Sequence, residues 1–405
     1  MLLSVFALLL AQNLAQPAPT APPDLPAAIR LAQEGRDAEA LAALQKVVAA
    51  NPNEHLARLW IANVQAHMGH PDLAEAVYHS VVLEDPRNVD AWVGLGTVLL
   101  QQDRVVEGLD ALKRAELLSP ENPNVVAALA NGYRLAGEDV ESISYYERLN
   151  TMAPTPVNLM TLENARRQHG HRFQSQTYDE EFNGTTPSTR GEDFALNYRL
   201  SEVVRVIGHG QVQSKFDRRE QRYGGGVEWR YTPWGTVTGQ VLVGSDDNVV
   251  LPQRDFLGHV EYGYRRATYT GTLRYFDFLG ANVTLLSPGV TVAVTPRWTA
   301  GLRYAFTSTE TTTTTGINNH TLDLRAAHEM APRIWLRGGY VHGIENFDLL
   351  SNPVNQLDEF RADTVNVGVQ FLLPSLTSIV GGYDYQWREG GVRMGRINVG
   401  LVQAF

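Results

Sequence analysis

The second half of the chain alternates apolar and polar residues with a period of two. From about residue 171 onward, short runs place an apolar side chain at every other position, often with a charged residue or Gln between. This is the period of an extended strand, whose successive side chains point to opposite faces of a sheet. The runs are residues 194–200, 227–231, 260–264, 302–306, 322–325, 365–371 and 383–387. They predict many strands, but not which face is inside, because a soluble sandwich alternates in the same way.

The last ten residues, 396–405, form the clearest of these predicted strands. Its apolar positions are Ile397, Val399, Leu401 and Phe405. A final strand that ends on an aromatic residue is typical of β-barrels delivered to a Gram-negative outer membrane, where these positions serve as the assembly signal. The alternative is a half-buried edge strand of a soluble sandwich. In a barrel this strand would pair with the first one, near residues 172–182, and leave no exposed edge.

The connections between the runs alternate in length. Short ones are predicted at residues 201–204, 233, 265–266, 296, 332 and 374–375. Longer, polar ones are predicted at residues 183–191, 217–221, 245–254, 277–282, 308–319, 345–359 and 388–392. Together they imply about 14 strands, an even number, with both ends on one side. A sandwich has no reason to sort its loops by side, so the alternation favours an antiparallel outer-membrane β-barrel over residues 171–405.

Aromatic residues near the short turns favour the same fold. Trp234, Trp298 and Trp335 each follow a proline-marked turn by one to three residues. We expect them at one height of the barrel, at a membrane interface where an indole ring prefers to lie. The opposite aromatic girdle is predicted from Tyr275, Phe276 and Phe278.

Charged residues inside the strands should face the barrel lumen. A basic residue on the lipid side would cost roughly 2–4 kcal/mol at the midplane. The predicted lumen-facing residues are Glu228, Arg230, Glu261, Arg274, Arg303, Asp323, Arg325 and Asp384. A hydrated, salt-bridged interior is their simplest role. About 14 strands fall between a side-chain-filled eight-stranded barrel and an open porin, which allows a narrow channel.

The first half of the chain repeats with a period of 34 residues. Pro52, Pro86, Pro120 and Pro154 keep this spacing, and so do Gly35, Gly69, Asp103 and Gly137. Three further series are predicted to pack the repeats together, two of small residues and one of bulky residues. They are Ala28, Ala62, Gly96 and Ala130; Ala40, Ala74, Gly108 and Ser142; and Leu44, Tyr78, Leu112 and Tyr146.

These spacings resemble the tetratricopeptide repeat, a helix-turn-helix unit of 34 residues. The resemblance covers about four units over residues 27–154 and implies a right-handed α-helical solenoid with a concave surface. It also implies a protein or peptide partner bound on that surface. Trp60 and Trp92 could stack on a ligand, but packing between units is the simpler expectation. Residues 155–170 predict a final capping helix and linker.

The N-terminus predicts export from the cytoplasm. Residues 1–15 contain an apolar run of signal-peptide length that is too short to span a bilayer, although no Lys or Arg precedes it. Residues 16–26, rich in proline, predict an extended spacer. The absence of cysteine is compatible with an oxidising periplasm, and the net charge of −10 argues against nucleic-acid binding.

Motifs for catalysis or metal binding are scarce. His328 and Glu329 lack the second His of a zinc-binding H-E-x-x-H helix, and His169 and His171 have no third ligand at a suitable spacing. The chain contains no G-x-S-x-G nucleophile motif. We therefore predict no enzyme, cofactor or metal site, with a barrel lipid hydrolase as the least favoured alternative.

The combination of signal peptide, 34-residue repeats, Pro-Trp-Gly (233–235) and Pro-Arg-Trp (296–298) turns and a terminal Phe resembles the YaiO-type outer-membrane β-barrel family. It is more distantly similar to export porins for poly-N-acetylglucosamine and cellulose, which have longer repeat arrays and a larger barrel. The resemblance implies an outer-membrane protein, in contact with lipid, whose periplasmic repeats recruit a protein partner for envelope transport, with exopolysaccharide as one cargo. The alternative is a scaffold in envelope or outer-membrane assembly.

Overall fold

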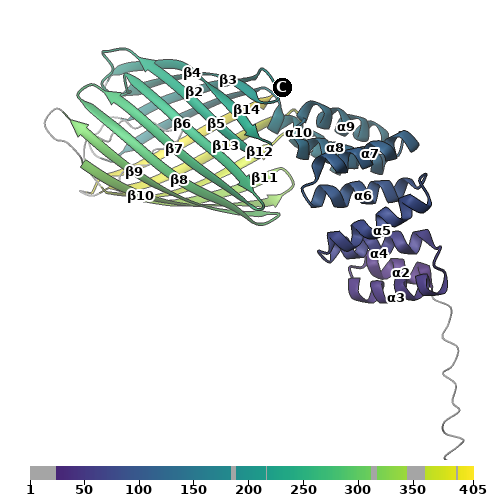
Figure 1. Ribbon diagram of the computed structural model, residues 1–405. Helices are drawn as coiled ribbons and strands as arrows, with labels where there is room; N and C mark the ends of the chain where they lie inside the picture. Colours follow the sequence, from purple (N-terminus) through teal and green to yellow (C-terminus); the bar gives the residue numbers. More distant parts are fainter. Residues whose placement is uncertain (1–23, 184–187, 216, 312–316, 344–360, 389–390) are drawn as a thin grey trace, which may run out of the picture. The chain divides into compact units, whose positions relative to one another are not determined.

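The computed structural model describes residues 24–183, 188–215, 217–311, 317–343, 361–388 and 391–405, and all structural statements below concern these ranges. The chain divides between Asn158 and Leu159 into two compact units (Figure 1). The first is helical and the second contains the sheet. Each unit is described by itself.

The first unit is a series of helices in which consecutive members pack together (Figure 1). They are α2 (Leu25–Gln33), α3 (Asp37–Ala50), α4 (His55–His67), α5 (Pro71–Glu84), α6 (Val89–Gln101), α7 (Val105–Leu118), α8 (Pro123–Ala136) and α9 (Asp139–Met152). Among the helices described here, none is long and apolar enough to cross a membrane.

The glycine series of the repeat has a backbone cause. Gly35, Gly69 and Gly137 each follow the first helix of a pair and have φ values of 73°, 84° and 79°. Asp103, which holds the same position in its repeat, has φ of 61°. Glycine adopts this left-handed conformation without strain, and aspartate is one of the few other residues that tolerates it. The series therefore marks the turn inside each helix pair.

The small residues of the repeat lie where helices touch. Ala40, Ala62, Ala74 and Ala130 are completely buried. A Cβ added to Gly96 would lie 2.6 Å from the Leu112 Cγ and 2.9 Å from the Gly108 carbonyl oxygen, so α6 and α7 approach too closely for a side chain there.

Bulky residues fill the remaining space between the helices. Tyr78 is buried and donates a 2.6 Å hydrogen bond from its hydroxyl to the Asn63 Oδ1, and Tyr146 is also buried. Trp60 and Trp92 pack against the hydrophobic clusters between helices. Pro86 and Pro120 lie in the turns that join one pair to the next.

The helix expected over residues 155–170 is α10 (Pro156–His169), and from Leu159 onward it belongs to the second unit. Glu163 accepts a 2.8 Å hydrogen bond from Arg333, and Arg167 donates to the Leu373 carbonyl oxygen at 2.5 Å. At the C-terminus of the helix, Arg205 donates to the Gln168 carbonyl oxygen and Arg199 to that of His169, each at 2.8 Å. The two arginines satisfy carbonyls that a helix end leaves without partners.

The second unit is a closed barrel of 14 strands, each antiparallel to both neighbours (Figure 1). The strands are β1 (Arg172–Phe182), β2 (Thr189–Arg199), β3 (Val204–Lys215), β4 (Arg218–Thr232), β5 (Gly235–Gly244), β6 (Arg254–Tyr264), β7 (Ala267–Phe278), β8 (Ala281–Thr295), β9 (Trp298–Thr311), β10 (Ile317–Ala331), β11 (Ile334–Gly343), β12 (Ala362–Leu372), β13 (Thr377–Arg388) and β14 (Arg393–Ala404). The predicted fold class is confirmed, and β14 pairs with β1 to close the sheet.

The connections sort by side, but not strictly by length. We call the end of the barrel near His171 the turn end and the opposite end the loop end. Two connections at the loop end, which we expected to be long, are tight: Lys215 and Arg218 pair directly, as do Phe278 and Ala281. Residues 218–221, 277–278 and 281–282 continue the strands instead of forming loops, because their backbone groups stay paired up to the rim. Residues 312–316, within the connection predicted at 308–319, and all of residues 345–359 lie outside the described residues.

The outer face of the barrel is apolar. Alternate residues of each strand face outward, so an aromatic residue lies on this face only if it occupies an outward position. Trp234 and Trp298 are about half exposed, at 48% and 47%, and Tyr275 is also exposed. Phe276 and Phe278 are instead buried in a cluster with Ala281 and Val283, so our expectation of a girdle position for them is wrong. Trp335 is also misplaced in the prediction, since it shares the parity of Arg337 and lines the interior.

Candidate functional site: the barrel interior

One sector of the interior, formed by β2 to β7, is filled by a network of buried charged and polar side chains. Its centre is the Asp255 carboxylate, which accepts hydrogen bonds from Arg222 at 2.7 Å and from Arg274 at 2.8 and 2.6 Å. Arg222 also donates to the Gln211 Oε1 at 2.6 Å, and only 2% of Arg222 is exposed. Charges removed from water in this way are tolerated only when they are paired and hydrogen-bonded.

The same network extends to the middle of the barrel wall through His209, which lies 2.7 Å from the Asp193 carboxylate and contacts Gln240. At the loop end, the Glu220 carboxylate accepts backbone N–H hydrogen bonds from Val249, Val250 and Leu251 at 2.8, 2.8 and 2.7 Å. Val250 and Leu251 are buried, so Glu220 ties the connection between β5 and β6 to the wall. This sector leaves little room for a solute.

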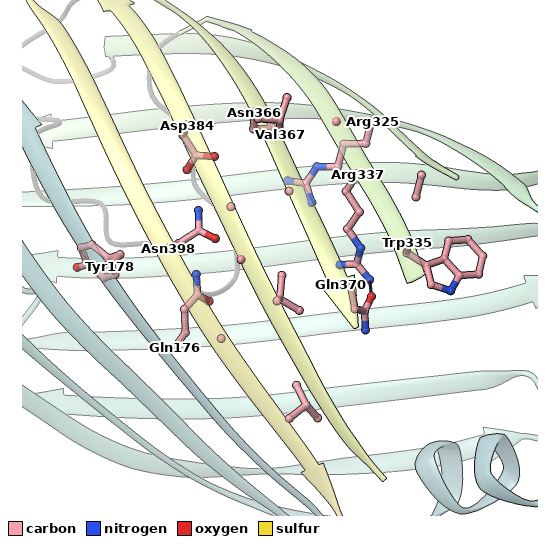
Figure 2. Close-up of a pocket in the computed structure, with 18 of the residues that line it drawn as sticks. Gln176, Tyr178, Arg325, Trp335, Arg337, Asn366, Val367, Gln370, Asp384 and Asn398 are labelled. Carbon is pink, nitrogen blue, oxygen red and sulfur yellow. Dashed lines mark hydrogen bonds between the residues drawn. The ribbon is translucent and has the colours of Figure 1, made fainter. Parts of the chain in front are cut away.

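The other sector, formed by β8 to β14, β1 and part of β2, contains a cavity of about 790 Å³. Figure 2 shows the side chains that surround it. They include amides, charged groups and two aromatic rings as well as Gly, Ala, Val and Leu residues. The labelled polar and aromatic members are Gln176, Tyr178, Arg325, Trp335, Arg337, Asn366, Gln370, Asp384 and Asn398. A cavity of this size and chemistry can hold a hydrophilic molecule.

Glycines on the inner face make the space. Gly301, Gly368, Gly382 and Gly400 line the cavity, each at an inward position of its strand. The cross-strand register sets Arg337 opposite Gly368, Gly368 opposite Gly382, and Gly382 opposite Asn398. Two neighbouring positions without side chains thus separate a guanidinium from an amide, and the wall is hollow between them.

A second row of paired positions carries the charges. Across β10 to β14 and β1, register sets Arg325 opposite Gly339, then Asn366, Asp384, Arg396 and Glu180 in turn. Arg396 bonds to Glu180 and lies 3.8 Å from Asp384. Asp323 accepts a 2.9 Å hydrogen bond from Arg303 and is also paired with Arg325. Two arginines therefore share one carboxylate on β9 and β10, whereas two carboxylates share one arginine on β13, β14 and β1.

The structure places all the predicted lumen-facing residues on the inner face. Arg274 joins the filled sector, whereas Arg325 and Asp384 line the cavity. Glu228 pairs with Arg205 at 3.4 Å, and Arg230 lies 3.3 Å from the His169 ring. Glu261 faces inward, as Asp255 does on the same strand, but it belongs to neither the filled sector nor the cavity lining.

The sequence interpretation missed the residues that define both sectors. They are Asp193, Gln211, Arg222, Asp255, Arg337 and Arg396, together with the inward glycines. Parity could have found several of them, since Arg222 precedes the exposed Tyr223 and Arg337 follows the exposed Leu336. No local signal indicates which of them lie together.

The closing strand presents its apolar positions to the outside. Ile397, Val399 and Leu401 are 60%, 54% and 37% exposed. Phe405 donates its backbone N–H to the His171 carbonyl oxygen at 3.0 Å, and its ring is 5.6 Å from the His171 ring. Their role as an assembly signal stays a prediction. Within the described ranges, no group of three His, Asp or Glu side chains could hold a metal ion.

Comparison with known proteins identifies the helical unit. Residues 31–86 and 68–132 match the family model of the tetratricopeptide repeat. The helical unit is built of tetratricopeptide repeats. The peroxisomal targeting signal receptor of Candida albicans is 31% identical over 132 residues, which cover 32% of this chain and 19% of the receptor. The human protein O-mannosyl-transferase TMTC1 is 32% identical over 95 residues, 24% of this chain and 11% of the enzyme. The chain thus spans less than a fifth of the length of these curated relatives.

Two solved structures each match part of this chain. TTC0263, a thermophilic tetratricopeptide-repeat protein of Thermus thermophilus, is 22% identical with a TM-score of 0.34 and covers 36% of this chain and 80% of its own. The monoaromatic hydrocarbon channel CymD is 8% identical with a TM-score of 0.40 and covers 62% of this chain and 93% of its own. In this chain the repeats are followed by a closed barrel, and a closed barrel with an apolar outer face suggests an outer membrane.

Proposed function

We propose that this chain is a non-enzymatic outer-membrane protein that serves envelope transport. In this proposal the repeats lie in the periplasm and recruit a protein partner, and the barrel provides a polar path for a hydrophilic cargo. Exopolysaccharide is the cargo that the resemblance to the YaiO-type family and to export porins suggests. The observation that carries the proposal is a cavity of about 790 Å³, lined in part by charged and amide side chains, inside a barrel whose outer face is apolar.

The outer face supports the membrane part of the proposal. In lipid, an isolated sheet edge would leave its N–H and C=O groups without partners, whereas the pairing of β1 with β14 removes that edge. Exposed Leu, Val, Tyr and Trp side chains on the strands are poorly suited to water but well suited to hydrocarbon and its interfaces. Their number would be a severe aggregation hazard on a water-soluble surface.

The repeats support the part of the proposal that concerns a protein partner. Their relatives in fungi are named as receptors, and stacked repeats of this type present an extended surface for binding. We therefore assign to the repeats the binding of a periplasmic protein or peptide.

Single-channel recording in planar lipid bilayers tests the transport part. The full-length protein should pass ions, and Gly400→Leu should reduce the conductance because its side chain would enter the cavity without a backbone clash: a Cβ at Gly400 would be 3.6 Å from its nearest neighbour. Gly258→Leu is the matched control, since Gly258 lies between Leu257 and His259 on the outward parity of β6. A wild-type barrel that stays electrically silent contradicts transport.

The filled sector favours a second candidate, a scaffold in envelope or outer-membrane assembly. A barrel blocked by the Arg222 network would only anchor the repeats. This candidate predicts that periplasmic proteins co-purify with the chain while the bilayer shows no current. A lipid hydrolase is the remaining alternative, and release of fatty acid from phospholipid by the purified protein would favour it.

A further inference from the structure

One arginine of the cavity wall has no carboxylate partner among the residues that the structure describes. Arg337, on β11, donates a hydrogen bond to the Gln370 side-chain oxygen. Among the described residues, no Asp or Glu lies within ion-pairing distance of Arg337, in contrast to Arg222, Arg274, Arg303 and Arg396. A guanidinium in a confined polar cavity with only an amide partner retains most of its N–H donors for a ligand.

Arg325 adds a second positive charge beside it. Register sets Arg325 opposite Gly339 and Arg337 opposite Ala327, so the two arginines are diagonal neighbours on adjacent strands. Figure 2 shows both side chains at the same cavity, with Asn366 next to them. Arg325 shares the Asp323 carboxylate with Arg303, and it places a second guanidinium on this wall beside Arg337.

The neighbouring strands β13, β14 and β1 carry acidic groups. Asp384 and Glu180 both pair with Arg396. A molecule in the cavity therefore meets guanidinium donors from β10 and β11 and a carboxylate acceptor from β13. Asn398 and Gln176 supply amides that can both donate and accept.

From this arrangement we infer that the cavity binds a hydrophilic ligand through an anionic group, a carboxylate or a phosphate, held by Arg337 with Arg325 and the Gln370 and Asn366 amides beside it. Guanidinium groups recognise such oxyanions by parallel N–H hydrogen bonds. The hydroxyl or amide groups of the same ligand would face Asp384 and Asn398. The inference deepens the proposed function and rests on it for the location of the cavity in an envelope barrel.

Calorimetric titration of the full-length protein in detergent tests the inference without requiring conductance. The probes are glucuronate, glucose 6-phosphate and glucose, which share a ring and differ in charge. We expect at least one of the two anions to bind about tenfold or more tightly than glucose, and the better anion tells carboxylate from phosphate. Arg337→Gln should lower the affinity for that anion about tenfold, whereas Arg337→Lys should keep part of the affinity.

Arg297→Gln is the control, because Arg297 is an exposed arginine in the turn between β8 and β9. A heat-modifiability gel should show that every variant retains a folded barrel. Equal affinity for glucose and both anions, no binding of any probe, or an Arg337→Gln protein that binds like wild type would overturn the inference.

The two proposals fail separately. A protein that binds the anion but passes no current retains the anion site and loses the transport function. A protein that conducts but does not distinguish the probes retains transport and loses the anion site.

Discussion

The largest fully buried side chain that the structure describes in the repeats is Tyr78, whereas in the barrel it is Arg222. The repeats bury alanine, leucine and valine between helices and leave their Arg–Glu pairs at the surface, as with Arg104 and Glu107. The barrel does the reverse, with Leu273 and Trp298 outside and the Asp255 network inside. The same rule acts in both: a side chain faces the medium that solvates it, so the surroundings of each unit set the direction of its pattern.

The largest effect is expected from removing the charge at the centre of the barrel network, which tests whether buried charges stabilise the barrel. Asp255→Asn should destabilise the barrel by about 3–5 kcal/mol, because Arg222 and Arg274 would remain buried without the carboxylate that pairs with both. Urea unfolding in lipid vesicles measures the change. Asp179→Asn is the matched control, since its pair with Arg190 is exposed, and it should cost less than about 1 kcal/mol. Equal losses would contradict the assignment of a structural role to the network.

A charge on the outer face tests which medium surrounds the barrel. Leu273→Arg, at the centre of β7 with 57% exposure, should cost roughly 2–4 kcal/mol in a bilayer. Leu117→Arg in the repeats starts from a more exposed leucine, at 77%, and should change stability by less than about 0.5 kcal/mol. Both are measured by unfolding of the full chain in lipid vesicles. A harmless Leu273→Arg would contradict a lipid-facing position.

Overpacking of the repeats should have a smaller effect. Gly96→Ala should destabilise the helical unit by about 1–3 kcal/mol, because its Cβ would press on Leu112 and on the Gly108 backbone. Alanine has the higher helix propensity, so a loss of stability can be assigned to the contact. Thermal melting followed by far-ultraviolet circular dichroism, which reports helix content, measures it. Gln101→Ala, at an exposed position near the end of the same helix, should show no loss.

The smallest expected effect depends on pH. Burial, and secondarily the carboxylate of Asp90, raise the pKa of the Tyr78 hydroxyl above its ordinary value. The unfolded tyrosine ionises near pH 10, so its contribution is fully present below that pH and is lost as the pH rises toward the folded pKa. The free energy of unfolding should fall by about 1 kcal/mol when the pH is about one unit above 10. Tyr78→Phe should flatten this part of the stability profile, and an identical profile would contradict the prediction.

Much of the fold could be predicted because the 34-residue repeat and the two-residue alternation can each be read within a short segment of the chain. The spacing of 34 residues fixed the helix pairs, and the alternation located β14 and its partner β1. The errors also have local causes. Phe276 and Trp335 were assigned by residue type, although each shares the inward parity of an arginine two residues away, Arg274 and Arg337. The polar composition of residues 217–221 and 277–282 predicts loops, although polar residues near a rim can continue a strand.

The candidate site was less predictable. The sequence predicts that Arg325 and Asp384 face inward, but they are 59 positions apart in the chain. They come close together only because β10 to β13 are consecutive strands of the sheet. The glycines that hollow the wall, Gly368 and Gly382, are ordinary strand residues until the register sets them side by side.

By itself the sequence determined the two repeating patterns and therefore the two kinds of unit, because helix and strand periods are properties of a single segment. Only the tertiary structure decided that closure brings Glu180 to Arg396 and that the interior divides into a filled sector and a cavity. The physical reason is that strand register, not spacing along the chain, determines which inward side chains share a space and which charges neutralise one another.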